Sequence, residues 1–155
     1  MMRALSSIRA DQRGNSLIEM AIVAPVLATL LVGAVDISRG VSNKLRLEQA
    51  AQRTIELVQR SEYKTTDNPT LKADAEAAAG TGSVATVTAW LECNHNGTKL
   101  NYDTGVCATQ TEPYARYVQV TVQKTFKPMF GTRFFPGANP NGTFTLRAIA
   151  GVRTQ

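Results

Sequence analysis

The pattern of hydrophobic and polar positions begins with a long apolar run. Residues 17–35 are almost wholly apolar, and Ile37 extends the run past Asp36. Counted from Leu17 to Ile37, it has about 20 residues, which as a helix is enough to cross a ~30 Å hydrocarbon core. The sequence therefore predicts a transmembrane helix with one carboxylate near each margin, Glu19 and Asp36, where burial in lipid costs less.

The helical pattern continues beyond this run. Apolar residues recur at four-residue steps and then form a second stripe; they are Ile37, Val41 and Leu45, followed by Leu47, Ala51, Ile55 and Val58. This spacing predicts one long helix over residues 15–60, part membrane-spanning and part amphipathic. The Ser38-Arg39-Gly40 sequence leaves open the alternative of two separate helices.

Residues 61–155 have the pattern of a small head domain. Asp67-Asn68-Pro69 is a helix start signal, and an alanine-rich helix over 71–79 is expected to stop at Gly80. Three runs rich in alternating β-formers follow, at 83–91, 116–126 and 143–152. Two inward faces are predicted: Val118, Val120 and Val122, and Phe144, Leu146, Ala148 and Ala150. The fold class is α+β, a long N-terminal helix continuing into a head with a roughly three-stranded antiparallel sheet.

A loop between the last two strands is rich in phenylalanine. Phe130, Phe134 and Phe135 lie there with the basic residues Lys127 and Arg133. These rings either cover one end of the core or contact a membrane or a neighbouring protein.

The composition and charge of the chain limit the classes of partner it can bind. The chain has 155 residues, 19% of them charged, and a formal net charge of +5. Its basic residues are interleaved with acidic ones and form no continuous patch, which argues against nucleic acid as a partner.

Cys93 and Cys107 flank a polar loop, and a disulfide closing about 15 residues would stabilise the domain by roughly 3 kcal/mol. In an exported domain we favour this disulfide over two unrelated buried thiols.

Catalytic and metal-binding patterns are weak. His95 is the only histidine, and Cys93-x-His95 has no second ligand pair at zinc-like spacing. There is no glycine-rich phosphate loop and no nucleophile elbow. We therefore expect neither an enzyme nor a cofactor.

The first 14 residues have the charge of a membrane-targeting leader. Arg3, Arg9 and Arg13 stand against a single Asp11, and such positive charge keeps the N-terminus in the cytoplasm. The head then faces the periplasm or the exterior. An ordinary signal peptide cut near Val32-Gly33-Ala34 would instead release a secreted binding domain. An uncut chain would be a single-pass anchored partner of an envelope protein.

Glu19 favours a different cleavage. A carboxylate inside a membrane span costs roughly 2.5–3.5 kcal/mol, so it usually has a partner. Cleavage after Gly14 would give Asn15 a free α-amine at the membrane surface. That amine could pair with Glu19 of a neighbouring copy. The two helices would then pack closely through four small residues and one proline, which are Ala21, Ala24, Ala28, Gly33 and Pro25.

Several segments carry a family resemblance. Arg13-Gly14, Glu19-Met20-Ala21, Val23-Ala24-Pro25 and Asp36-Ile37-Ser38-Arg39 together resemble the TadE-type minor pseudopilins of the tight-adherence (Tad/Flp) type IV pilus system. Residues 90–93 and 114–120 resemble that family's C-terminal region more loosely. Met20 departs from the pattern, because an aromatic residue is common there. The chain also lacks the long extension of the largest relatives.

The resemblance implies a division into a prepilin-type leader (1–14), a long helix (15–60) and a pilin-like head (61–155). It implies cleavage between Gly14 and Asn15 by a prepilin peptidase. It also implies a role in pilus assembly, either in priming or as a subunit at the base or the tip. The partners would be other pilin and pseudopilin subunits, the inner-membrane assembly platform and the lipid bilayer. The protein would reside in the inner membrane and, after assembly, in the fibre.

Overall fold

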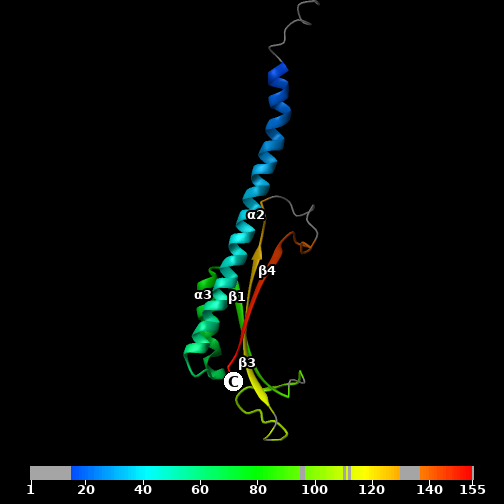
Figure 1. The fold of residues 1–155 in the computed structure, drawn as a ribbon. Coiled ribbons are helices and arrows are strands. Elements are labelled where there is room, and N and C mark those ends of the chain that lie inside the picture. Colours follow the sequence, from blue (N-terminus) through cyan, green and yellow to red (C-terminus); the bar gives the residue numbers. More distant parts are fainter. Residues whose placement is uncertain (1–14, 95–96, 110, 112, 130–136, 155) are drawn as a thin grey trace, which may run out of the picture. The chain divides into compact units, whose positions relative to one another are not determined.

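The structure, a computed structural model, describes residues 15–94, 97–109, 111, 113–129 and 137–154 (Figure 1). Its contacts divide the chain into two compact units, Met1–Arg39 and Gly40–Gln155. Helix α2 runs over Asn15–Arg60 and belongs in part to each unit. The first unit contributes the apolar run, and the second contains the end of α2 and the whole head.

Helix α2 is continuous through Ser38-Arg39-Gly40, so the alternative of two helices is wrong. One glycine inside a helix costs about 1 kcal/mol relative to alanine. The residues that follow Gly40 bury an apolar face in the head, and such packing is the main source of helix stability in proteins. The local weakness at Gly40 is therefore outweighed.

The head contains a short 3₁₀ turn, η2 (Thr65–Asp67), helix α3 (Asn68–Ala79) and four strands. The strands are β1 (Ser83–Cys93), β2 (Lys99–Asn101), β3 (Tyr114–Phe126) and β4 (Phe144–Arg153). They form one antiparallel sheet in the order β2-β1-β3-β4. The α+β class is confirmed, and the three predicted strands are β1, β3 and β4.

Strand β2 was not predicted from the sequence. It has three residues, which are too few for an alternating pattern, and it pairs with Trp90–Glu92 of β1. Its position depends on contacts that are distant in the chain rather than on its own composition. The sheet therefore has four strands rather than roughly three.

The core lies between one face of the sheet and the two helices. Buried side chains from every layer meet there; they include Leu47, Ala51 and Ile55 of α2, Ala75 and Ala79 of α3, and Val120, Val122 and Ala148 of the sheet. A second cluster joins Val58, Tyr63, Leu71, Tyr102 and Val118. Both predicted inward faces are thus used, with Leu146 and Ala150 packing at the margin. The loop phenylalanines 130, 134 and 135 lie outside the described residues.

The predicted signals also account for α3. Asp67 is its N-cap residue and Pro69 lies in its first turn, where a missing N–H has no cost. At the other end Gly80 has φ +88° and its N–H donates to the Glu76 carbonyl at 3.0 Å. This left-handed φ favours glycine and ends the helix.

Candidate functional site: the apolar segment of α2

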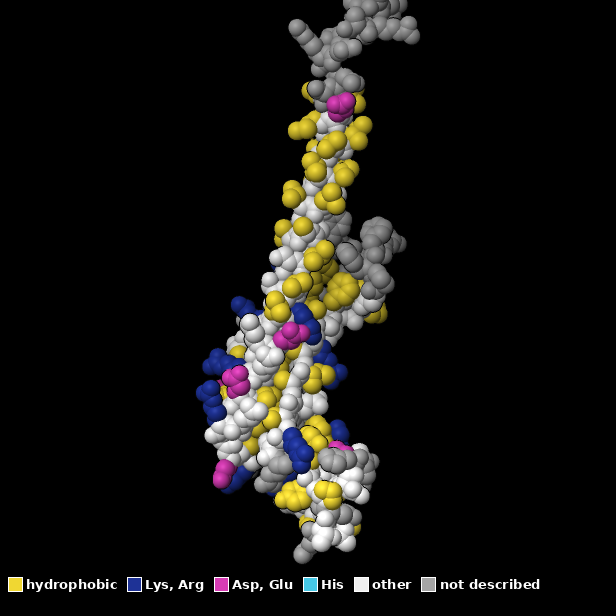
Figure 2. Space-filling view, viewed as in Figure 1, with side chains coloured by type: hydrophobic (Ala, Val, Ile, Leu, Met, Phe, Trp, Pro, Cys, Tyr) yellow, Lys and Arg dark blue, Asp and Glu magenta, His cyan; other side chains and the backbone are white. Residues whose placement is uncertain are grey.

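In the apolar segment of α2, residues 17–37, the large apolar side chains are mostly exposed, whereas Asp36 is buried. Leu17 is 74% exposed and Leu31 is 68% exposed. An 18-residue window of this helix has a mean hydropathy of 2.2, with none of it buried (Figure 2). Figure 2 shows apolar side chains on the helix there and charged ones on the head. A helix this long and apolar fits a single-pass membrane anchor.

Glu19 lies one turn into α2, and its side chain is exposed. Asn15 is the first residue of the helix, so the expected cleavage point directly precedes it. Gly14 lies outside the described residues.

Helical geometry separates Glu19 from most of the small residues. At 3.6 residues per turn, each residue is rotated about 100° from the previous one. Ala21, Ala24, Pro25 and Ala28 therefore share a stripe about 100° wide, centred about 170° from Glu19. We call these four residues the small-residue stripe.

Gly33 does not belong to that stripe. It lies about 40° from the direction of Glu19, on the other side of the helix. A Cβ atom built on Gly33 would have no atom within 4 Å. The five predicted packing residues thus divide between two faces of α2, which the sequence reasoning did not distinguish.

Pro25 lies inside a helix that continues past it. Because proline has no N–H, the carbonyl of Ala21 lacks its usual partner four residues on. The Thr29 hydroxyl donates to the carbonyl of Val26, the residue after Pro25, at 2.8 Å. The backbone of the small-residue stripe therefore offers an acceptor as well as a close-approach surface.

The C-terminal margin of the apolar segment is polar. The Asp36 carboxylate lies 3.8 Å from the Arg39 guanidinium, one turn along the helix. Pairing reduces the cost of a carboxylate close to lipid. The expected second charged margin therefore carries an ion pair.

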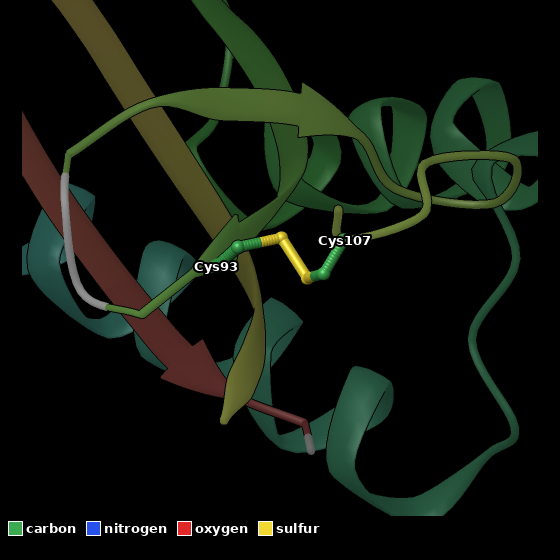
Figure 3. Close-up of a disulfide and its surroundings, with 2 residues drawn as sticks. All are labelled: Cys93 and Cys107. Atoms are coloured by element: carbon green, nitrogen blue, oxygen red, sulfur yellow. A yellow bond between two sulfur atoms is a disulfide. The ribbon is translucent and has the colours of Figure 1, made fainter. Parts of the chain in front are cut away.

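The head carries the predicted disulfide between Cys93 and Cys107 (Figure 3). Cys93 ends β1, and the Cα atoms of the two residues are 5.7 Å apart. The closed loop contains β2, which adds a strand to the same end of the sheet. The cross-link therefore holds the segment that has the fewest ladder contacts.

A cleft of about 700 Å³ lies in the head beside the end of α2, lined by residues that include Tyr63, Tyr102, Asp103, Arg116 and Arg153. The rings of Tyr63 and Tyr102 meet edge to face at 5.0 Å. Burial, with the nearby Tyr102, raises the pKa of Tyr63 to about 12. The Tyr63 hydroxyl donates to the Asn68 side-chain oxygen, which links the start of α3 to this core.

Of the two candidate metal ligands, only Cys93 lies within the described residues. Within the described residues, no group of three or more His, Cys, Asp or Glu side chains could hold a metal. Cys93 is in the disulfide, and His95 lies outside the described residues.

Comparison with known proteins adds one finding. Residues 14–55 match the family described as TadE-like protein. This segment belongs to the TadE-like family. The match begins at the glycine of the expected cleavage point and ends within the buried stripe of α2. The match associates this segment with the Tad pilus system.

The matched range stops before the head, so the looser resemblance at residues 90–93 and 114–120 stays a prediction. No curated protein and no solved structure gives a significant match to this chain.

Proposed function

We propose that this TadE-like protein is a minor pseudopilin that takes part in the assembly of a Tad/Flp pilus. The observation that carries the proposal is Glu19, an exposed carboxylate one turn inside an uncovered apolar helix. The TadE-like match over residues 14–55 includes this carboxylate and the glycine before the helix. A membrane anchor alone would give no reason for a charge at that depth.

The first step is hydrolysis of the Gly14–Asn15 peptide bond by a prepilin peptidase. It removes the basic leader 1–14 and leaves a positive α-amine on Asn15 at the start of α2. The head, residues 61–155, stays on the periplasmic side, and the helix, residues 15–60, remains anchored in the inner membrane.

The second step is lateral association of helices. The Asn15 amine of one copy pairs with Glu19 of a neighbouring pilin or pseudopilin, and the pair lowers the cost of both charges in lipid. Ala21, Ala24 and Ala28 allow a second helix to approach closely, because membrane helices associate through small residues and polar groups.

The apolar segment has two different faces, and this supports contact with more than one neighbouring subunit. Glu19 and the small-residue stripe point in nearly opposite directions. One helix can therefore contact two neighbours at once, which suits a fibre or its base better than a simple pair. The inner-membrane assembly platform and the bilayer complete the set of proposed partners.

The test separates cleavage from assembly. In cells that make the pilus, Glu19→Ala should leave the mature mass unchanged and reduce piliation strongly. The matched control is Glu48→Ala, which removes an exposed carboxylate that pairs with Lys44 in the head unit. Normal piliation with Glu19→Ala would sink the pairing step.

A second variant tests the processing site. Gly14→Val should block cleavage and leave the full-length chain in the membrane. A normally shortened product would refute the site. A product starting near Val35 would instead favour a secreted binding domain, and an uncut native chain would favour an anchored envelope partner.

A further inference from the structure

The two edges of the head sheet are treated differently. Strands β1 and β2 form one side of the sheet, and β4 is the last strand on the other side. An open edge presents unpaired backbone N–H and C=O groups, which can pair with another chain. The two edges of this sheet differ in how many of their outward backbone groups are bonded to other parts of the head.

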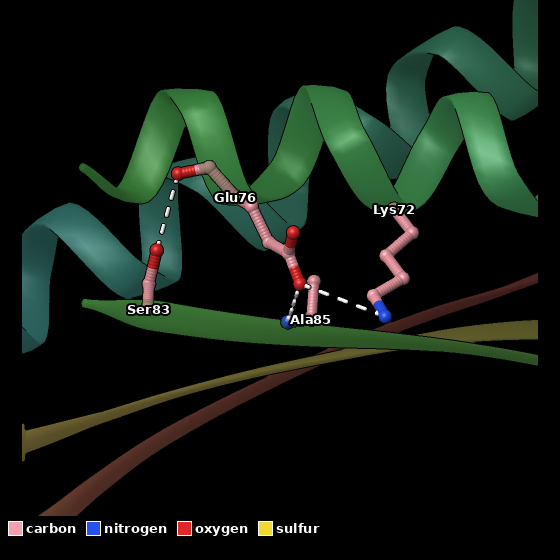
Figure 4. Close-up of polar contacts among 4 residues, drawn as sticks. All are labelled: Lys72, Glu76, Ser83 and Ala85. Carbon is pink, nitrogen blue, oxygen red and sulfur yellow. Dashed lines mark hydrogen bonds and ion pairs between the residues drawn. The ribbon is translucent and has the colours of Figure 1, made fainter. Parts of the chain in front are cut away.

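Helix α3 closes the β1 edge (Figure 4). The Glu76 carboxylate accepts the backbone N–H of Ala85 at 3.0 Å, and the Ser83 hydroxyl donates to the Glu76 carbonyl at 3.1 Å. Lys72 holds the same carboxylate from 3.9 Å. Farther along β1, residues Trp90–Glu92 pair with β2. The β1 edge is therefore occupied along much of its length.

The pairing pattern shows which β4 groups point outward. The N–H of Thr154 donates to the Arg116 carbonyl at 2.8 Å, in register with the β3–β4 ladder. Because backbone direction alternates along a strand, the even-numbered residues of β4 bond to β3 and the odd-numbered ones point away. The Lys44 ammonium donates to the outward carbonyl of Arg147, as this alternation requires.

From Arg147 onward the outward groups belong to Arg147, Ile149, Gly151 and Arg153, which we call the β4 edge. In the part of the chain that the structure describes, no strand pairs with this side of β4. The Ile149 side chain is 55% exposed, and Gly151 and Arg153 are also exposed. Lys44 thus covers the Arg147 position of this edge.

Charge selects the kind of segment that fits. Strand β4 carries two charged residues, Arg147 and Arg153, and both are basic. Arg147 and Arg153 bracket the β4 edge. Pairing with the β4 strand of a second copy would bring these arginines together, whereas an acidic segment would complement them.

We propose that the β4 edge accepts an extended acidic segment of another protein as an additional antiparallel strand. Backbone bonds to Ile149 and Gly151 provide the attachment, as in other cases of strand addition. Carboxylates at the ends of the segment face Arg147 and Arg153, and apolar side chains between them cover Ile149.

The test uses the full-length protein in detergent micelles and a blocked, labelled peptide, Glu-Thr-Val-Thr-Val-Thr-Glu. The control peptide replaces both glutamates by lysine. We expect the acidic peptide to bind at least ~10-fold more tightly, with amide NMR shifts at Ile149 and Gly151. Equal binding of both peptides, or shifts centred on β1, would overturn the proposal.

Methylated peptides test the backbone bonds without altering the protein. N-methylation of both valines removes the donors expected to face Ile149 and Gly151, and should weaken binding by about 10-fold or more. N-methylation of two threonines should have little effect. If the valine-methylated and the threonine-methylated peptides bind equally, no strand is added, and the arginines alone attract the peptide.

An Ile149→Pro variant provides the matching change in the protein. Proline removes an outward N–H and spares the β3 ladder, and it is tolerated on edge strands. Ile149→Thr keeps the N–H and is the control. Loss of peptide binding is expected only with proline. Because these titrations require no pilus, their failure and the failure of the proposed assembly role are separable.

Discussion

The two halves of α2 are built from similar apolar residues, but they are covered to very different extents. In the apolar segment, residues 17–37, the large side chains are exposed; Leu30, for instance, is 65% exposed. In the half that belongs to the head, Leu47 is fully buried and Val58 is 1% exposed. The buried half packs on Val118, Val120 and Val122 of its own sheet. The exposed half has no such surface within its unit.

This difference shows what each half requires. Burial of apolar area in water stabilises the head half by the hydrophobic effect. The exposed half gains nothing from that effect until lipid or another helix surrounds it. Its association must then depend on small residues and on the charge of Glu19, because lipid tails are as apolar as leucine.

The largest expected contrast comes from one substitution made in each half. Leu47→Ala leaves a cavity in the core and should lower the free energy of unfolding of the head by about 2–5 kcal/mol. Leu30→Ala should leave it unchanged. Denaturant unfolding of the purified protein in detergent, followed by near-UV circular dichroism, measures both. Equal effects would show that the two halves share one cooperative unit.

Removal of the disulfide should act on the head alone. Cys93→Ser with Cys107→Ser should lower the free energy of unfolding by roughly 3 kcal/mol, as expected for a loop of this length. Cleavage of the leader and insertion of α2 should be normal, and mass spectrometry with membrane fractionation checks this. A processing defect in the double variant would contradict the separation of the two regions.

The stability of the head should depend on alkaline pH through Tyr63. Its pKa is raised from 10.0 to about 12 by burial and then by Tyr102, so the folded state holds its proton more tightly than the unfolded state. The contribution is complete below about pH 10 and declines as the pH rises towards 12. Tyr63→Phe should remove this part of the pH dependence, and unfolding midpoints of both proteins across that range measure it. An unchanged profile would contradict the assignment.

The smallest expected effect concerns the small-residue stripe. Ala28→Leu should weaken self-association of the helix in detergent by about threefold, since single contacts between membrane helices average about 0.6 kcal/mol. Analytical ultracentrifugation compares it with Leu27→Val, which changes a neighbouring position outside the stripe. If both variants associate like the unmodified chain, the stripe is not a contact surface.

Much of the fold was predictable because its signals are local. The strands β3 and β4 begin and end within about two residues of their predicted limits, since alternating valine, threonine and alanine fix their inward faces. Asp67, Pro69 and Gly80 fix α3 in the same way. The spacing of Cys93 and Cys107 favoured the disulfide before any geometry was available.

The remainder depends on distant contacts. Strand β2 exists because Leu100 meets Leu91 in the ladder, which no local pattern encodes. The continuity of α2 through Gly40 depends on how well residues 47–58 pack on the sheet. The opposition of Glu19 and the small-residue stripe follows from helical rotation and could have been derived from the sequence. The contrast between the closed β1 edge and the β4 edge required the sheet order.

The most direct test of the central claim is the N-terminus and intact mass of the native mature protein, isolated from membranes. If a prepilin peptidase cuts after Gly14, the mature chain starts at Asn15, with Glu19 at its fifth position and the apolar segment retained. A start near Val35 would contradict the central claim, because the exposed half of α2 would then be a discarded signal. A chain that still carries its leader would also contradict it, since Glu19 would have no α-amine to pair with.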